Sequence, residues 1–147
     1  MANSYQRTYS VRLVNLVMRT LIRLNVAPRR MHLLSVQGRK SGRWYSTPVT
    51  VIEAKEQRWL VAPYGNVAWV HNARATGQIT LTRGRKTDSV GIVEVDATES
   101  APILKKYLAL EPIARPYFDV RSDAALDAFV EEAPRHPVFR LKNTLDT

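Results

Sequence analysis

The N-terminal part of the chain has hydrophobic positions at helical spacing. Between residues 10 and 24 the apolar side chains are separated by three or four residues, which predicts an amphipathic helix. These positions are Val14, Val17, Met18, Leu21 and Ile22. The other side of the helix carries Arg12, Arg19 and Arg23, and Asn25 followed by Pro28 predicts its end. Two interpretations of this helix stay open: a cap over the hydrophobic core, or peripheral contact with an anionic membrane surface.

After residue 30 the pattern changes to short runs rich in β-branched and aromatic residues, which are typical of strands. We expect strands at 32–37, 44–53, 58–62, 79–82, 89–95 and 137–141. Pro48 predicts a sheet edge or a bulge within the second strand. Helices are expected at 67–76, ended by Gly77, and after the caps Ser100 and Ser122.

This order of elements predicts an α+β fold whose antiparallel strands close, or nearly close, into a barrel. The chain shows no internal repeat, linker or low-complexity segment. We therefore expect one domain over residues 1–147, in which residues 1–30 form an N-terminal helix extension.

Composition narrows the class of protein. A hydrophobic content of 45% and a charged content of 24% are ordinary for a globular protein, so the chain is not expected to be disordered. The formal net charge of +9 is unusual and predicts an affinity for anions. Charge alone does not distinguish nucleic acid, membrane lipid and a phosphorylated small molecule.

The residue types also exclude several chemistries. The absence of cysteine excludes disulfides, thiolate metal sites and cysteine nucleophiles. His32, His71 and His136 lack the spacing of a zinc-binding helix, so no metal site is expected. Arginines interrupt the N-terminal apolar residues, which argues against a signal peptide, and no run approaches the roughly twenty apolar residues of a membrane span. We expect a cytoplasmic protein.

The most informative segment is the basic turn, defined as residues 38–43. Its residues are Gly38, Arg39, Lys40, Ser41, Gly42 and Arg43. Glycines allow close backbone approach, successive amides can bind an anion, and arginine matches the geometry of phosphate. The turn lacks the ending of a nucleotide-binding P-loop and does not open a helix. From the residues alone, an anion site and an ordinary solvated hairpin turn are equally good interpretations.

A second candidate segment connects the predicted strand 58–62 to the predicted helix 67–76. Its residues are Ala62, Pro63, Tyr64, Gly65 and Asn66. Loop amides and the start of a helix can face an anion or the polar edge of a ring. Trp69 on the helix is interpreted as core packing rather than as a ligand contact.

The ordered set of short motifs resembles the deazaflavin-dependent nitroreductase family. The resemblance runs from about Leu33 to Val95 and rests on four motifs. They are Gly-Arg-Lys-Ser-Gly at 38–42, Ser-Thr-Pro at 46–48, Leu-Val-Ala at 60–62, and Trp69 followed by Asn-Ala-Arg-Ala at 72–75.

The resemblance implies a split β-barrel of the FMN-binding type and the deazaflavin coenzyme F-420, which donates hydride in its reduced form. It implies an electron-poor acceptor: a quinone, a nitroaromatic or an activated alkene. By position, Arg39 and Lys40 are expected to hold the phosphate and acidic tail of the coenzyme, with Ser41 and Gly42 as further donors. Thr47 and Pro48 are expected beside the ring system, and the loop Ala62–Asn66 at the ring edge.

Two departures from the family pattern concern the ring pocket. The family has its third cation at the position of Tyr45, whereas this chain has Arg43, two residues earlier. On a strand these two positions share a face, so Arg43 is expected to substitute. The loop before Trp69 is shorter than in the family, which leaves the choice of acceptor open. In the C-terminal third, Tyr117 is the candidate substrate contact, with closure of the barrel as the alternative role.

Three alternatives to this oxidoreductase remain. The first is an FMN- or heme-binding protein of the wider split-barrel superfamily, and the second is a non-catalytic coenzyme-binding protein. The third is a nucleic-acid-binding module, in which residues 83–86 and the N-terminal arginines supply cations and Trp44, Tyr45 and Tyr64 stack on bases. Since no RNA-binding signature occurs, a nucleic-acid partner is not expected.

Overall fold

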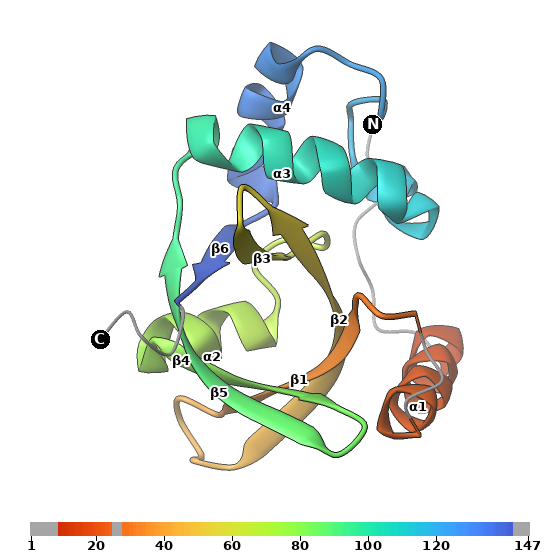
Figure 1. Cartoon of the computed structure of the whole chain (residues 1–147), viewed down its shortest axis with the longest axis vertical. Coiled ribbons are helices and arrows are strands. Elements are labelled where there is room, and N and C mark those ends of the chain that lie inside the picture. The colour runs from red at the N-terminus through yellow and green to blue at the C-terminus, as the bar shows by residue number, and fades with distance from the viewer. Residues whose placement is uncertain (1–8, 25–27, 143–147) are drawn as a thin grey trace.

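The computed structural model describes residues 9–24 and 28–142, and side chains of α1 from Asn15 onward apart from Arg23. Six antiparallel strands form a closed barrel in the order β1-β2-β3-β6-β5-β4 (Figure 1). The strands are β1 (Met31–Gln37), β2 (Trp44–Ala54), β3 (Gln57–Val61), β4 (Gln78–Arg83), β5 (Lys86–Glu94) and β6 (Val138–Leu141). The predicted α+β barrel is confirmed.

Helices flank the barrel on several sides (Figure 1). They are α1 (Tyr9–Arg23), α2 (Ala68–Thr76), α3 (Ala97–Leu110), α4 (Leu126–Glu132) and the 3-10 helices η1 (Pro112–Tyr117) and η2 (Ala133–Arg135). α3 and α4 pack together over one end of the barrel, and α1 lies outside β1 and β2. α2 packs against β1 and β4, which places it next to the turn that ends β1.

The barrel closes because two long strands change partners. β2 pairs with β1 up to Thr50 and with β3 from Val51, and β5 pairs with β4 up to Gly91 and with β6 from Ile92. Pro48 lies opposite Leu33 in the half of β2 that does not pair with β3. Its missing N–H therefore costs no hydrogen bond between β2 and β3, as expected for proline at a sheet edge.

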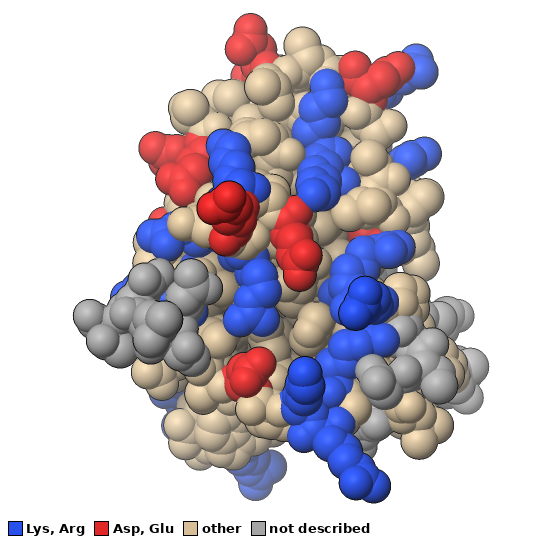
Figure 2. All heavy atoms as spheres, in the orientation of Figure 1, with Lys and Arg blue, Asp and Glu red and all other residues tan. Residues whose placement is uncertain are grey.

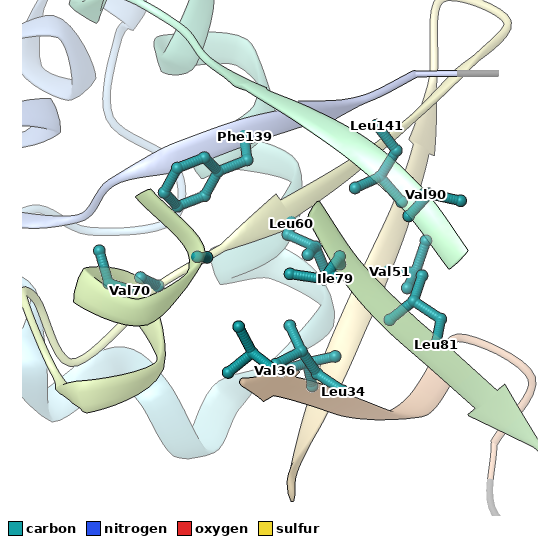
Figure 3. Packing of buried hydrophobic residues seen from close by; sticks show 13 residues of the cluster. Leu34, Val36, Val51, Leu60, Val70, Ile79, Leu81, Val90, Phe139 and Leu141 are labelled. Atoms are coloured by element: carbon teal, nitrogen blue, oxygen red, sulfur yellow. The ribbon is translucent and has the colours of Figure 1, made fainter. Parts of the chain in front are cut away.

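The middle of β2, the end of β3 and β6 are buried on both faces, which explains their nearly continuous apolar runs, whereas most of β5 is exposed or half-buried. Val51 of β2 and Leu60 of β3 point into the barrel, where they join Leu34, Leu81, Phe139 and their neighbours (Figure 3). The next residues, Ile52 and Val61, pack in a second cluster with α3 and α4. The alternation of side chains along a strand thus supplies both cores.

Both serine caps predicted in the C-terminal half are wrong. Asp96 caps α3, because its side chain accepts the N–H of Glu99 at 2.9 Å, and Ser100 is buried within the helix. α4 begins after Ala125, which has no side-chain cap, so Ser122 lies outside it. By contrast, the prediction that Gly77 ends α2 is confirmed, since its φ of 72° is left-handed.

α1 is rotated relative to the prediction. Ile22 is fully buried and packs with Leu33, Met18 and Leu21. Val17, expected toward the core, is 49% exposed, whereas Arg19, expected in solvent, donates from Nη2 to the carbonyl oxygen of Ser46. A period of 3.6 residues tolerates this rotation because apolar residues occur all around the helix.

Candidate functional site

The basic turn is the hairpin between β1 and β2. The N–H of Gly38 donates to the carbonyl oxygen of Arg43 at 2.6 Å, and the N–H of Gly42 donates to that of Gly38 at 3.0 Å. A Cβ on Gly38 would lie 2.8 Å from Cε2 of Tyr45, so glycine is required here by the tyrosine ring. Gly42 is required by its φ of +71°.

Because several of its amides donate within the protein, the turn offers an anion mainly its side chains. Ser41 Oγ accepts the N–H of Arg43 at 3.2 Å and lies 3.4 Å from the hydroxyl oxygen of Tyr45. The serine hydroxyl thus shapes the turn and lies at its exposed surface together with the Tyr45 ring.

Asn72 on α2 anchors the turn. Its Oδ1 accepts both the backbone N–H of Arg39 at 3.1 Å and Nη1 of the same residue at 2.8 Å. Asn72 is only 4% exposed, and it is the functional residue that sequence reasoning missed. The signal was a polar residue between the buried positions Val70 and Ala73, since a buried amide requires a partner.

The cations of the turn have no carboxylate partner in the described part of the chain. Arg39 is held by a neutral amide, and Lys40 and Arg43 are exposed. Among residues 28–142 no carboxylate forms an ion pair with any of these three side chains. The turn therefore presents up to three positive charges to a ligand.

Basic side chains also gather elsewhere on the surface. Figure 2 shows Lys and Arg in a column on the right of the view, on the side of the molecule where α1 lies. At the start of β1, the pKa of His32 is lowered chiefly by burial and further by Arg83 and Arg58. The net charge is thus spread over the molecule, which favours attraction of anions in general.

Thr47 and Pro48 follow the turn along β2. Thr47 pairs with Leu34 and Pro48 with Leu33, and both side chains are half-buried. Because side chains alternate along a strand, Thr47 shares the face of Tyr45 and Val49, whereas Pro48 lies on the opposite face. Thr47 thus lies between the turn and the core, and a ring on that face meets Thr47 rather than Pro48.

We call residues 62–66, between β3 and α2, the coenzyme loop, after the role that the resemblance in the sequence predicts for them. Ala62 is buried and donates its N–H to Pro137 at 2.8 Å. Gly65 has a φ of +87° and donates its N–H to Ala62 at 3.3 Å. Oδ1 of Asn66 accepts Nη1 of Arg74 at 3.0 Å. The loop is thus fixed at both of its ends.

Three tyrosines gather beside this loop. The rings of Tyr64 and Tyr117 meet edge to face, with centroids 4.8 Å apart. Burial, with a further contribution from Tyr64, strongly raises the pKa of Tyr107 on α3, so that this phenol stays protonated. The structure thus brings the predicted substrate residue Tyr117 against the coenzyme loop.

α2 carries Trp69, follows the coenzyme loop, and anchors the basic turn through Asn72. The Trp69 ring packs on Phe139 at a centroid distance of 5.9 Å, which confirms its interpretation as core packing. Asn72 follows the cap Val67 by five residues, or about 7.5 Å along the helix axis. α2 therefore holds the coenzyme loop at its N-terminus and the basic turn one to two turns later.

A separate cavity of about 160 Å³ lies behind the loop, between β5, α3 and η2. Asn66 lines it together with Arg74 and Glu94, which form an ion pair at 2.7 Å that raises the pKa of Arg74. Of the predicted site residues only Asn66 reaches this cavity, and its principal cation is neutralised. We therefore do not assign the predicted site to this cavity.

Two searches of the described residues gave no candidate. Residues 9–24 and 28–142 contain no cluster of three or more side chains suited to hold a metal ion. None of the helices in these ranges has the length and hydropathy needed to cross a membrane.

Comparison with known proteins identifies relatives. Residues 6–139 match the model of the family described as F420H(2)-dependent quinone reductase. None of the curated proteins has significant sequence similarity to the chain.

Solved structures share the fold. An F420-H2 dependent reductase (FDR-A) is 22% identical, with a TM-score of 0.53, over 78% of this chain and 95% of that one. A chain described as a domain-swapped dimer is 18% identical, with a TM-score of 0.57, over 92% of this chain and 100% of that one. Atu2129 of Agrobacterium tumefaciens, of unknown function, is 18% identical with a TM-score of 0.57, over 95% of this chain and 57% of that one.

Proposed function

Since this chain belongs to the F420H(2)-dependent quinone reductase family, it is an oxidoreductase that uses coenzyme F-420, and we propose that its electron acceptor is a quinone. The match over residues 6–139 establishes the use of coenzyme F-420 that the resemblance in the sequence implied. The finer assignments, namely the acceptor and the residues that hold the coenzyme, are our proposal.

The single observation that carries the site assignment is the set of unpaired cations on the basic turn. Arg39, Lys40 and Arg43 have no carboxylate partner among the described residues, and Asn72 holds Arg39 in a fixed position. A phosphate with an acidic tail fits such a donor set, because each oxygen gains a charge-assisted hydrogen bond. The residues present therefore fit coenzyme F-420.

The remaining residues of the proposal orient the ring system and the acceptor. We propose that Thr47, which follows the turn on β2, and the coenzyme loop orient the ring system, and that Tyr117, which lies beside Tyr64, contacts the acceptor. Reduced coenzyme F-420 supplies a hydride when bound. The reduction of a quinone by hydride also consumes one proton, and we propose the phenols of Tyr64 and Tyr117 as its donors.

A quinone dissolved in a membrane requires that the protein reach the lipid surface. Leu16 and Val17 on α1, and Leu24 directly after it, are 60%, 49% and 66% exposed, away from the contact of Ile22 with the barrel. We propose that this outer face contacts the membrane.

The experiment that tests the proposed function is a titration of the protein with oxidised coenzyme F-420, followed by tryptophan fluorescence, with FMN in parallel. We expect saturable binding of the deazaflavin and turnover of a soluble quinone by its reduced form. Binding of FMN alone would replace the coenzyme, and binding without turnover of quinones, nitroaromatics or activated alkenes would make the chain a coenzyme-binding protein. Binding of a single-stranded oligonucleotide instead would overturn the proposal.

A further inference from the structure

A buried carboxylate lies behind the coenzyme loop and has no part in the function proposed so far. Glu132 at the end of α4 is fully buried. Its Oε1 accepts the backbone N–H of Asp119 at 2.8 Å, and Arg135 donates to both carboxylate oxygens at 2.6 to 3.1 Å. Arg135 also lies 3.3 Å from the carboxylate of Asp119. A buried charge with so many partners links the segment after η1 to the segment before β6.

His136, one turn later, links the same cluster to the coenzyme loop. The ring is 3% exposed and stacks on Phe118 at 3.7 Å with an angle of 6° between the planes. Nδ1 lies 2.7 Å from the carbonyl oxygen of Pro63. Because a carbonyl oxygen can only accept, Nδ1 carries the hydrogen and the ring tautomer is fixed. Nε2 has no hydrogen-bond partner in the described part of the chain and faces Oε2 of Glu132 at 3.4 Å.

The cluster thus holds both partners of the tyrosine pair. Pro63, bonded to His136, precedes Tyr64, and Phe118, stacked on His136, follows Tyr117. The two tyrosine rings meet at 4.8 Å. In addition, a Cβ on Gly65 would lie 3.4 Å from the carbonyl oxygen of Arg135, so the backbone of η2 also lies against the loop.

We propose that Glu132 and His136 are positioning residues that fix the coenzyme loop against the Tyr117 segment and so hold the ring site ready for its ligand. Both side chains are buried, and neither is placed to touch the reacting atoms. The inference rests on the proposed function, because the role of the loop in binding the coenzyme is part of it. Loss of this support should weaken coenzyme binding.

Two substitutions of His136 separate its hydrogen bond from its volume. His136→Phe keeps a ring that stacks on Phe118 but cannot donate to Pro63. His136→Asn loses the ring but keeps an N–H donor at the position of Nδ1. His71→Asn, an exposed histidine of α2, is the matched control. Glu132→Gln keeps the acceptor for Asp119 and removes the charge that Arg135 binds.

The first readout needs no coenzyme. Hydrogen exchange of the amides of Gly65 and Val67 reports the order of the loop, and the amides that pair β1 with β4 report whether the barrel is folded. We expect about tenfold faster exchange at the loop in His136→Phe and a smaller increase in His136→Asn and Glu132→Gln, at unchanged barrel exchange. Unchanged loop exchange in His136→Phe would overturn the inference. If His136→Phe does not fold, unchanged loop exchange in Glu132→Gln and His136→Asn would overturn it.

The second readout is the affinity for oxidised coenzyme F-420. Roughly tenfold weaker binding by His136→Phe, partly restored in His136→Asn, is the expected result. Equal affinity in all variants would overturn the inference. Absence of binding by the wild-type protein would instead refute the proposed function, and the exchange measurement would still decide whether the pair orders the loop.

Discussion

Oδ1 of Asn72 accepts two hydrogen bonds from one residue, Arg39, at 3.1 Å from its backbone nitrogen and 2.8 Å from its guanidinium. One buried amide oxygen thereby fixes both the path of the basic turn and the direction of its first cation. Because the anchor is neutral, the charge of Arg39 stays available to a phosphate.

This arrangement predicts different costs in affinity for two substitutions of Asn72. Asn72→Ala frees the turn, and we expect about fivefold to tenfold weaker binding of coenzyme F-420, the loss of one ordered hydrogen-bonded anchor. Asn72→Asp keeps the anchor but neutralises Arg39, so its affinity should fall further and recover less at low salt. Fluorescence titration measures both, with Thr76→Ala on the same helix as control. Equal affinities in the two variants would show that the charge of Arg39 has no part in binding.

The exposed cations of the turn predict a dependence on salt. Lys40→Ala and Arg43→Ala should each weaken coenzyme binding by roughly tenfold, since each removes one charge-assisted contact to an anion. The remaining affinity should also depend less steeply on salt concentration. Lys86→Ala, in the hairpin between β4 and β5, removes the same charge away from the site and should leave the affinity within about twofold. Wild-type affinity in Lys40→Ala would move the anion site elsewhere.

The N-cap of α3 is Asp96 in the structure, whereas the sequence predicted Ser100. Asp96→Ala should lower the free energy of unfolding by about 1 kcal/mol, because the N–H of Glu99 loses its acceptor. Ser100→Ala should cost less, since the serine hydroxyl makes only a long contact of 3.4 Å to the carbonyl oxygen of Val95. Urea unfolding monitored by circular dichroism compares the two variants. The reverse order would restore Ser100 as the cap.

This example shows the limit of reading local patterns. The barrel was predictable because strands buried on both faces have continuous apolar runs and because Gly77 and Pro48 mark an end and an edge. Ser100 was mistaken for a cap because a serine before an apolar run is ambiguous, and Asp96 starts the helix one turn earlier. Such boundaries depend on which N–H groups lack partners in three dimensions.

The site divides in the same way. Arg39 and Lys40 form a local motif, so the basic turn was visible in the sequence. Asn72 lies 33 residues from its partner Arg39, and His136 lies 73 residues from Pro63. Glu132 on α4 holds Asp119, which lies in the segment after η1. Nothing in the spacing of such residues predicts their partners, because the partners meet only when the barrel closes.

Buried His136 and half-buried His32 predict a pH dependence of stability. Burial is the largest influence on His136 and lowers its pKa below the ordinary value of 6.5, although Pro63 and Glu132 act in the opposite direction and Arg135 adds to the lowering. Burial likewise lowers the pKa of His32, with Arg83 and Arg58 in the same direction and the Arg30 carbonyl and Asp88 opposed.

The sign follows from which state binds more protons. Below pH 6.5 the unfolded chain takes up protons that the folded protein does not, so the free energy of unfolding should fall as the pH is lowered from 7 toward the folded pKa values. Urea midpoints between pH 5 and 8 measure this, and His136→Asn should flatten the profile while His71→Asn leaves it unchanged. A midpoint that rises on acidification would show that Glu132 outweighs burial.

The outer face of α1 predicts membrane binding that depends on few side chains. Leu16, Val17, Thr20 and Leu24 follow one another at helical spacing, so they form one face, and its three apolar members are largely exposed. Burial of this face in the interfacial region of a bilayer gains roughly 25 cal/mol per Å² of apolar surface, and the protein's positive charge adds attraction to anionic lipid.

We expect the wild-type protein to sediment with vesicles of phosphatidylcholine and phosphatidylglycerol. The double variant Leu16→Ser, Val17→Ser should bind about tenfold more weakly, whereas Leu126→Ser, which removes a similarly exposed leucine on α4, should bind as the wild type does. If all three proteins bind equally well, the attraction is due to charge alone and α1 serves only to cover Leu33.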